Sequence, residues 1–182
     1  SAPSSPSSRA AHRTARAGAP TISELTAVPG NIGLSESDKA ARVREIFQPY
    51  HERIEAELDR RTQAGRAVAL IAMHSFTPSY KGVARPWHAG VLYNRDPRFA
   101  HLLMAGLKRE EGLVVGDNEP YAVSDQTDYT IPVHGEMRGL ISTGVEIRQD
   151  LIGTKAEAER WADIFGDGLA PILGDPALYR LF

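Results

Sequence analysis

Residues 67–74 read Ala-Val-Ala-Leu-Ile-Ala-Met-His, and this stretch decides the class of fold. Its apolar residues follow one another without polar alternation, which predicts a short strand buried on both faces of a sheet. His74 comes at the end of that strand, and Ser75-Phe76-Thr77-Pro78 then favours a loop. Because α/β folds bind ligands at the carboxyl ends of their strands, His74 is a candidate site residue. A hydrogen-bonded structural histidine is the alternative.

Strand and helix patterns alternate on both sides of this stretch. A helix is expected from Glu36, behind a capping box of Ser35 and Asp38, and Pro49 should kink or divide it. Further elements are expected as strands at 90–93, 113–116 and 143–148, and as helices at 97–109 and 155–173. This alternation predicts an α/β fold with three layers, in which a mixed sheet is flanked by helices.

Composition limits the classes of function. The chain has 182 residues, 42% hydrophobic and 24% charged, which fits one globular domain. A net charge of -2 gives no electrostatic basis for binding nucleic acid or an anionic membrane. Without cysteine, any metal must be held by His, Asp or Glu. No apolar run is long enough to span a bilayer, so a cytoplasmic location is the default expectation.

The first residues differ from the rest. Ser1 to Thr21 consist mainly of Ser, Ala, Pro and Arg and include no acidic residue, so we expect residues 1–27 to be disordered. An organelle transit peptide is the alternative for this segment. Residues 28–182 are expected to form the folded domain.

Several polar clusters follow the expected strands. Arg85 and Arg95 either clamp a substrate carboxylate or form surface ion pairs, and His88 lies between them in sequence. The stretch 117–120 is either a site segment or a polar turn. The segment 134–139, His-Gly-Glu-Met-Arg-Gly, is either a loop that closes over an anionic substrate or a mobile loop without a ligand.

Glu146 is the strongest single candidate, because it is an isolated acid between Val145 and Ile147. A carboxylate at such a position is costly to bury without a partner. It either forms a structural ion pair with Arg148 on the same face of the strand or lines an active site as a general base.

Four segments together resemble one family, the N-formylglutamate amidohydrolases. They are PGNIGLSESDKAARVREIFQPYHERIEAELDRR (29–61), ALIAMHSFTPSYKGVARPWHAGVLYNRDPR (69–98), VVGDNEPYAVSDQTDYTIPVHGEMRG (114–139) and GVEIRQDLI (144–152). The resemblance extends from about Pro29 to the C-terminus. It implies a fold like that of zinc carboxypeptidases and aspartoacylases, and a hydrolase that cleaves the formamide bond of N-formyl-L-glutamate or a similar N-acylated acidic amino acid. It also implies a role in histidine degradation.

The resemblance further implies roles for individual residues. His74 corresponds to a histidine ligand of a zinc or other divalent metal ion, and Glu146 to the general base of the wider superfamily. Arg85, His88, His134 and Arg138 become candidates for binding the carboxylates of the substrate and the developing oxyanion. A metal ion would lower the pKa of bound water and polarise the formyl carbonyl. The expected partner is a small acidic molecule, and homo-oligomers are possible.

The N-terminal part is where the sequence departs from the family. A Pro-His-x-Gly-like loop with a following acid and an Asp-x-Asn-Arg-like segment are expected before the Pro29 turn, and residues 1–28 contain neither. The N-terminal metal ligands are therefore expected to be missing, whereas a catalytic zinc site uses three protein ligands. The alternative function is an inactive remnant that acts only as a small anion-binding or structural domain.

Overall fold

The computed structural model describes residues 20–23 and 25–180. The chain divides into two compact units, Ser1–Arg66 and Ala67–Phe182. Each unit is described by itself below. The expectation of disorder falls mostly on residues 1–19, outside the described residues, but two short strands form in the remainder of that segment. These strands, β1 (Ile22–Ser23) and β2 (Thr26–Ala27), pair in antiparallel fashion.

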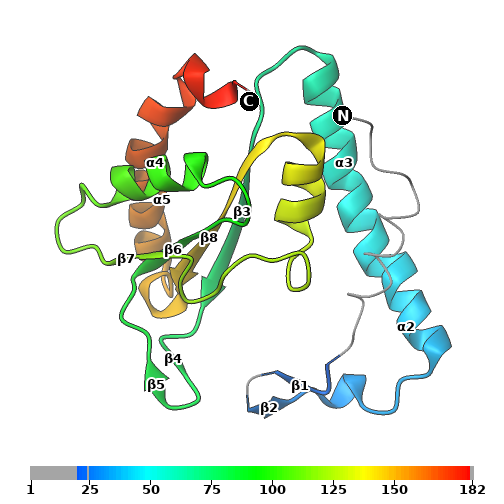
Figure 1. Cartoon of the computed structure of the whole chain (residues 1–182). Helices are drawn as coiled ribbons and strands as arrows, with labels where there is room; N and C mark the ends of the chain where they lie inside the picture. Colours follow the sequence, from blue (N-terminus) through cyan, green and yellow to red (C-terminus); the bar gives the residue numbers. More distant parts are fainter. Residues whose placement is uncertain (1–19, 24, 181–182) are drawn as a thin grey trace. The chain divides into compact units, whose positions relative to one another are not determined.

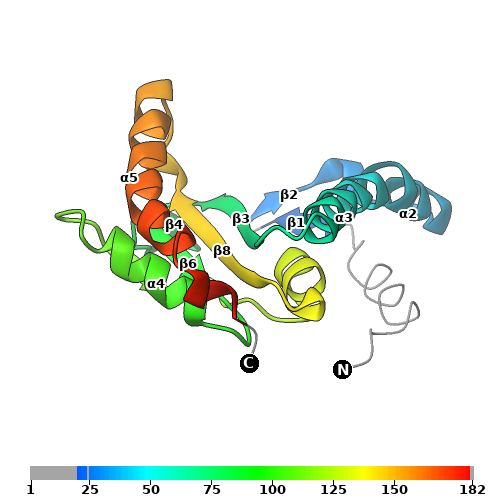
Figure 2. The ribbon, with the colours of Figure 1, turned by 90° about the horizontal axis from the view of Figure 1, so that it is seen from above.

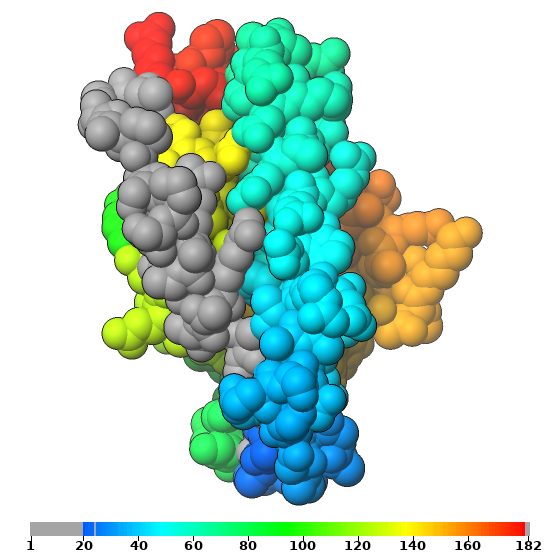
Figure 3. Space-filling view, turned by 90° about the vertical axis from the view of Figure 1, so that its right-hand side faces the viewer, coloured from blue at the N-terminus to red at the C-terminus, as the bar shows by residue number. Residues whose placement is uncertain are grey.

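The first unit is mainly helical (Figure 1, blue to cyan), and Figure 3 shows one face of its side chains in the same colours. After a 3₁₀ turn, η1 (Pro29–Asn31), α2 (Glu36–Arg42) begins with the predicted capping box of Ser35 and Asp38. The helix continues through a π-helical turn, η2 (Val43–Phe47), into α3 (Gln48–Gln63). Pro49, which cannot donate a backbone hydrogen bond, falls in the first turn of α3 directly after the π-helical turn, so the α-helical pattern is interrupted near the predicted place but the helix is not divided.

The π-helical turn also changes which side chains share a face. Ile46, Tyr50 and Leu58 recur at helical spacing in the sequence, but Ile46 and Tyr50 are 69% and 61% exposed, whereas His51 and Leu58 are buried. A π-turn holds more residues than an α-turn, so the helical phase shifts where η2 passes into α3. A single α-helical period across residues 43–58 does not account for this change of face.

The second unit contains a mixed four-stranded sheet in the order β3, β8, β6, β7 (Figure 1). These strands span Ala69–Phe76, Ile141–Arg148, Ala89–Leu92 and Val115–Asp117 respectively. β3 is parallel to β8, β6 is parallel to β7, and β6 is antiparallel to β8. The prediction of an α/β fold with a mixed sheet is therefore confirmed.

β3 differs from its prediction as a strand buried on both faces. Within the described residues β3 pairs only with β8, so it lies at an edge of the sheet. Its first four residues are half-buried, Met73 is 52% exposed, and His74 lies inside the strand rather than after it. An unbroken apolar run does not distinguish a central strand from an edge strand, because both require only β propensity.

One face of the sheet packs against two helices, α4 (Arg98–Leu107) and α5 (Lys155–Leu173), as Figure 2 shows. Apolar side chains of the helices, among them Leu103 and Trp161, form a closed core with the facing strand residues Ala89, Val91 and Val145. The two helices cross closely: a Cβ added at Gly106 would lie 2.8 Å from the carbonyl oxygen of Gly168. α4 and α5 match the helices predicted from the sequence.

The opposite face of the sheet carries a π-helical segment, η3 (Thr130–Gly135), which contacts β3 and β8. A 3₁₀ turn, η4 (Glu136–Arg138), follows, so the predicted mobile glycine loop is helical instead. A Cβ at Gly135 would lie 2.3 Å from Oγ of Ser142, which shows that close packing, not flexibility, requires this glycine.

Smaller elements complete the second unit. A hairpin of β4 (Ser79–Tyr80) and β5 (Val83–Ala84) follows β3, and two 3₁₀ turns flank α5, η5 (Gln149–Leu151) and η6 (Pro176–Tyr179). Within the described part of the chain, no helix combines the length and the apolar character that crossing a bilayer requires.

Candidate active site

The site begins with the alternation of side chains along β8. Val145 and Ile147 point into the core beneath α4 and α5, so Glu146 between them points to the opposite face. In the parallel pairing of β3 with β8, His74 lies in register with Glu146. Residues in register on neighbouring strands share a face, and both side chains line one cavity of about 300 Å³. The structure therefore brings together two residues that are 72 positions apart in the sequence.

This cavity has a floor formed by the sheet and a wall formed by the segment before η3 together with the first two residues of η3. The floor includes Ala72, Leu92 and Gly144, and the wall includes Val123 and the residues from Thr127 to Ile131. A second cavity, of about 370 Å³, shares Leu92, Thr127, Asp128 and Glu146 with the first and is also lined by Tyr121. Glu146 thus faces both hollows.

Glu146 has no ordinary structural role. It is 8% exposed, and its Oε2 atom is buried without a hydrogen-bond partner among the described residues. Burial raises the pKa of Glu146 to about 7, and the negative charge of Asp128 adds to this, while Arg85 acts in the opposite direction. The predicted alternative of an ion pair with Arg148 is wrong, because Arg148 binds Asp150 through its Nε at 2.8 Å.

Asp128 is a site residue that the sequence analysis missed. It lines both cavities, and its carboxylate accepts hydrogen bonds from the backbone N–H of Ser124 at 3.3 Å and from Oγ1 of Thr127 at 3.0 Å. The segment 124–128 reads Ser-Asp-Gln-Thr-Asp, a composition typical of turns. That composition predicts a turn, but it does not indicate which of its two acids faces Glu146.

Arg85 lies near Glu146 in a setting that leaves part of its guanidinium available. It is only 8% exposed, and its carbon Cζ lies 4.8 Å from the ring centre of Tyr80 and 4.9 Å from that of Tyr121. Its Nη1 donates to the carbonyl oxygen and Oγ1 of Thr77, at 3.3 and 3.1 Å. Among the described residues no carboxylate pairs with Arg85, so its remaining donors can serve a ligand.

Arg95 behaves differently from Arg85. Its guanidinium forms ion pairs with Asp125 and Glu136, so of the two interpretations the surface ion pair is the correct one for Arg95. The stretch 117–120 also has a structural role: Oδ1 of Asn118 accepts a hydrogen bond from the backbone N–H of Tyr93 at 2.9 Å. It lines neither cavity beside Glu146.

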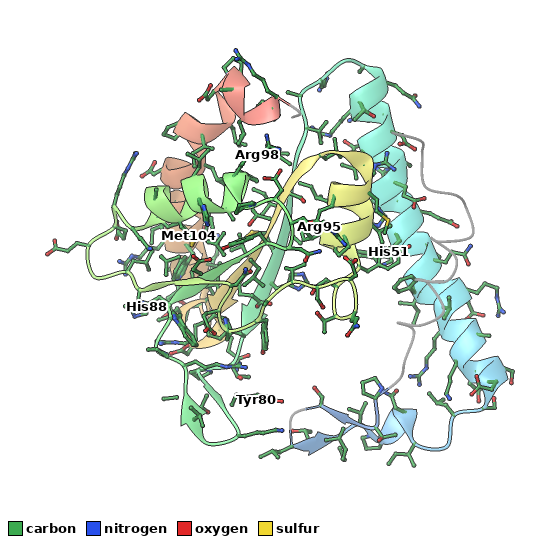
Figure 4. The ribbon with its side chains drawn as sticks, in the orientation of Figure 1. His51, Tyr80, His88, Arg95, Arg98 and Met104 are labelled. Carbon is green, nitrogen blue, oxygen red and sulfur yellow. The ribbon has the colours of Figure 1, made fainter. Side chains whose placement is uncertain are left out.

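Three other predicted site residues lie away from these two cavities. Nδ1 of His88 accepts a hydrogen bond from the backbone N–H of Val114 at 2.9 Å, and His88 lines a different cavity together with Trp161 of α5. His134 is completely buried, with its ring edge-on to that of Tyr129 at 5.5 Å. Arg138 is half-buried on η4. Figure 4 shows His88 and Arg95 well apart, and the two residues lie before and after β6 respectively.

The expected metal site can be tested against these positions. A catalytic zinc ion needs three protein ligands of the His, Asp or Glu type here. Within residues 20–23 and 25–180, no three such side chains come close enough together to hold a metal ion. The described residues therefore do not form a complete zinc site, and His74 is a single candidate ligand.

Comparison with known proteins relates the chain to one family and to solved structures. The sequence profile described as N-formylglutamate amidohydrolase matches residues 7–153. The match begins earlier than the expected Pro29, inside the segment predicted to be unrelated, and it ends before α5. A search of curated proteins found no match.

Two solved structures are similar. The gene product Atu2144 from Agrobacterium tumefaciens is 34% identical, with a TM-score of 0.75 over 85% of this chain and 62% of that one. An N-formylglutamate amidohydrolase from Ralstonia eutropha JMP134 is 20% identical, with a TM-score of 0.57 over 75% of this chain and 55% of that one, a likeness of fold alone. The chain thus spans less than two thirds of either protein.

Proposed function

We propose, because the chain belongs to the N-formylglutamate amidohydrolase family, that it is a hydrolase of linear amides. The proposed substrate is N-formyl-L-glutamate or a similar N-acylated acidic amino acid. The observation that carries the proposal is Glu146, a carboxylate that faces a cavity, has a pKa raised to about 7 and has a buried oxygen without a hydrogen-bond partner. A general base works best when its pKa is close to the working pH.

The proposed reaction uses Glu146 as the proton carrier. The ionised carboxylate accepts a proton from a water molecule while the oxygen of that water attacks the formyl carbon. The proton then passes from Glu146 to the amide nitrogen, the bond between carbon and nitrogen breaks, and formate and the free amino acid leave. Burial raises the free energy of the ionised carboxylate because it removes hydration. The same desolvation makes Glu146 a stronger base than an exposed glutamate.

Substrate recognition is proposed for Arg85. A guanidinium fixed between two tyrosine rings loses little further freedom when it binds a carboxylate, and its paired donors match the carboxylate geometry. The positive charge of Arg85 also acts to lower the pKa of Glu146, which supports the assignment of Arg85 to the same site. Among the four candidates for anion binding, we retain Arg85 and do not assign this role to His88, His134 or Arg138.

Zinc or another divalent metal remains a proposal that depends on residues beyond those described. His74 would supply one ligand, next to Glu146, and a metal ion would polarise the formyl oxygen. Since the described residues do not complete the ligand set, no step of the reaction above is assigned to a metal. A cytoplasmic location and a role in histidine degradation are likewise proposals.

The test is release of formate. The purified chain is incubated with N-formyl-L-glutamate, with and without added zinc, and formate and glutamate are measured together. Equal amounts of the two products from the wild-type chain, and none from a Glu146→Gln variant, are expected. Absence of formate in both zinc conditions would reject the proposed activity for this chain.

A binding function without catalysis is the second candidate, and the incomplete metal ligand set favours it. It predicts that N-acetyl-L-glutamate binds in titration calorimetry, that Arg85→Met weakens this binding, and that no formate is released under any condition. Formate release by the wild-type chain would exclude it.

A further inference from the structure

We propose that Arg95, together with Asn94, is a positioning residue that fixes the segment 118–129 as the wall of the cavities beside Glu146. This inference rests on the proposed function for its consequence in catalysis, but not for its geometry. The ion-pair partners of Arg95 among the described residues, Asp125 and Glu136, line neither cavity. Arg95 acts through the wall that it holds.

Asn94 and Arg95 bind two acids from different parts of the chain. Nδ2 of Asn94 donates to Oδ1 of Asp125 at 3.1 Å and to Oε2 of Glu136 at 3.0 Å. The backbone N–H of Arg95 donates to Oε1 of Glu136 at 2.7 Å, and the Arg95 guanidinium bridges both carboxylates. The end of β6 is thereby joined to the wall segment and to η4 at the same point.

The wall segment is attached at two other places. At its start, the backbone N–H of Asn118 donates to the carbonyl oxygen of Val91 at 3.0 Å, next to the hydrogen bond from Tyr93 described above. In its middle, Val123 is 6% exposed and packs with Leu92 and Ile131. Asp125 provides a further attachment, two residues before Thr127, which lines both cavities.

The position of Asp125 explains why this attachment bears on the site. Thr127 and Asp128 follow within three residues and line both cavities, and Tyr121, which precedes it, stacks on Arg85. Between Ser124 and Asp128 the turn is closed by hydrogen bonds of its own, and the side chain of Asp125 joins this turn to Asn94 and Arg95. The Arg95 cluster therefore sets where Asp128 and Tyr121 lie relative to Glu146 and Arg85.

The strength of this cluster differs from that of an ordinary surface ion pair. Isolated exposed pairs contribute little, because water screens them and both side chains lose freedom. Here the Arg95 side chain is 57% exposed but that of Glu136 is 9% exposed, and the same groups share several hydrogen bonds. Shared, partly desolvated networks are worth more than separate pairs.

The first test compares hydrogen–deuterium exchange of Arg95→Gln with that of the wild-type chain. Glu136 keeps its hydrogen bonds from Asn94 and from the backbone of residue 95, so the variant is expected to fold. Amide exchange in residues 121–129 is expected to accelerate about tenfold or more. The control is Arg160→Gln, which removes an exposed ion pair with Glu110 (3.2 Å) and should leave exchange in the wall unchanged.

The second test uses affinity and coupling. Arg95→Gln and Asp125→Asn should each raise KM for N-formyl-L-glutamate about fivefold to tenfold, with a smaller change in kcat, and the double variant should resemble either single variant. A merely structural role would lower the melting temperature of Arg95→Gln without changing wall exchange or KM, and this result would overturn the inference. If the wild-type chain releases no formate, the proposed function fails, while the exchange experiment still decides the role of Arg95.

Discussion

The two faces of β8 carry residues of opposite kinds within a few positions of one another. On one face, Val145 and Ile147 pack into the closed core beneath α4 and α5, and Val145 has no exposed surface. On the other face, Glu146 is also buried, but it borders two cavities and has an oxygen without a hydrogen-bond partner. Burial alone therefore does not separate stability from function in this strand.

The difference lies in what each buried group gains. An apolar side chain in a packed core gains free energy from leaving water, at roughly 25 cal/mol per Å² of buried surface. A carboxylate loses hydration on burial, and Glu146 recovers little of it, as its raised pKa shows. Substitutions on the core face of β8 should therefore change the free energy of unfolding, and substitutions on the cavity face should change the rate of the reaction.

The largest expected effect is the loss of turnover in Glu146→Gln. Glutamine has almost the same shape but cannot accept the proton from water, so kcat should fall by about a thousandfold. Formate release measures this change, and circular dichroism should show an unchanged fold. Loss of turnover below tenfold would mean that another group acts as the base.

The same substitution should stabilise the fold at alkaline pH. A rise of the pKa from 4.5 to about 7 means that the folded state binds the Glu146 proton more tightly than the unfolded chain, at a cost of up to roughly 3 kcal/mol once the carboxyl ionises. The free energy of unfolding of the wild-type chain therefore falls as pH rises through this range. Glu146→Gln should be more stable than wild type at pH 8 and equal to it at pH 4, as urea titrations would show. Equal stability at both pH values would argue against a raised pKa.

Val145→Ala should have the reverse profile. Removing two methyl groups from a fully buried position leaves a small cavity and should lower the free energy of unfolding by about 2 kcal/mol. Urea unfolding measures the loss, and kcat per folded molecule should stay within about twofold of wild type, because the adjacent Glu146 keeps its place on the strand. A large loss of kcat at full folding would show that the two faces are not independent.

Arg85→Met should affect binding more than turnover. The loss of a charged hydrogen-bond donor to a substrate carboxylate should raise KM for N-formyl-L-glutamate about tenfold. Assays well above pH 7 keep Glu146 ionised, so that the influence of Arg85 on the Glu146 pKa does not confuse the result. KM for N-formyl-L-methionine, whose side chain is uncharged, is the control, and an equal rise for both substrates would mean that Arg85 does not bind the side-chain carboxylate.

The smallest expected effect is that of Asp128→Asn on the pKa of Glu146. Because burial contributes more than the charge of Asp128, removing that charge should lower the pKa only part of the way toward its ordinary value. Titration of the Glu146 carboxyl carbon by NMR measures the shift, with Asp150→Asn as a control. An unchanged or higher pKa in Asp128→Asn would show that Asp128 does not face Glu146.

Much of the fold was predictable because local patterns determine it. The helices α4 and α5 and the strand β8 follow from periodicity, and the capping box at Ser35 follows from residue types at fixed spacing. The edge position of β3 was not predictable, because it depends on which strands are its neighbours. The helical state of residues 130–138 was also missed, since its glycines read as loop residues while close packing against Ser142 explains Gly135.

The candidate site was likewise predictable only in part. His74 and Glu146 could be named from their places on strands, and the register of β3 with β8 then puts them side by side. Asp128 could not be named, because its approach to Glu146 depends on where Arg95 and Asn94 hold a loop. For Arg85 and Arg95 two interpretations were equally consistent with the sequence, and only the positions of neighbouring acids in space distinguish the two residues.

The dependence of kcat/KM on pH tests the assignment of Glu146 as general base most directly. With N-formyl-L-glutamate as substrate, the wild-type chain should show kcat/KM rising tenfold per pH unit below an apparent pKa of about 7 and levelling off above it. A profile that is flat between pH 5 and pH 8, or one that Glu146→Gln reproduces at wild-type rates, would contradict the account.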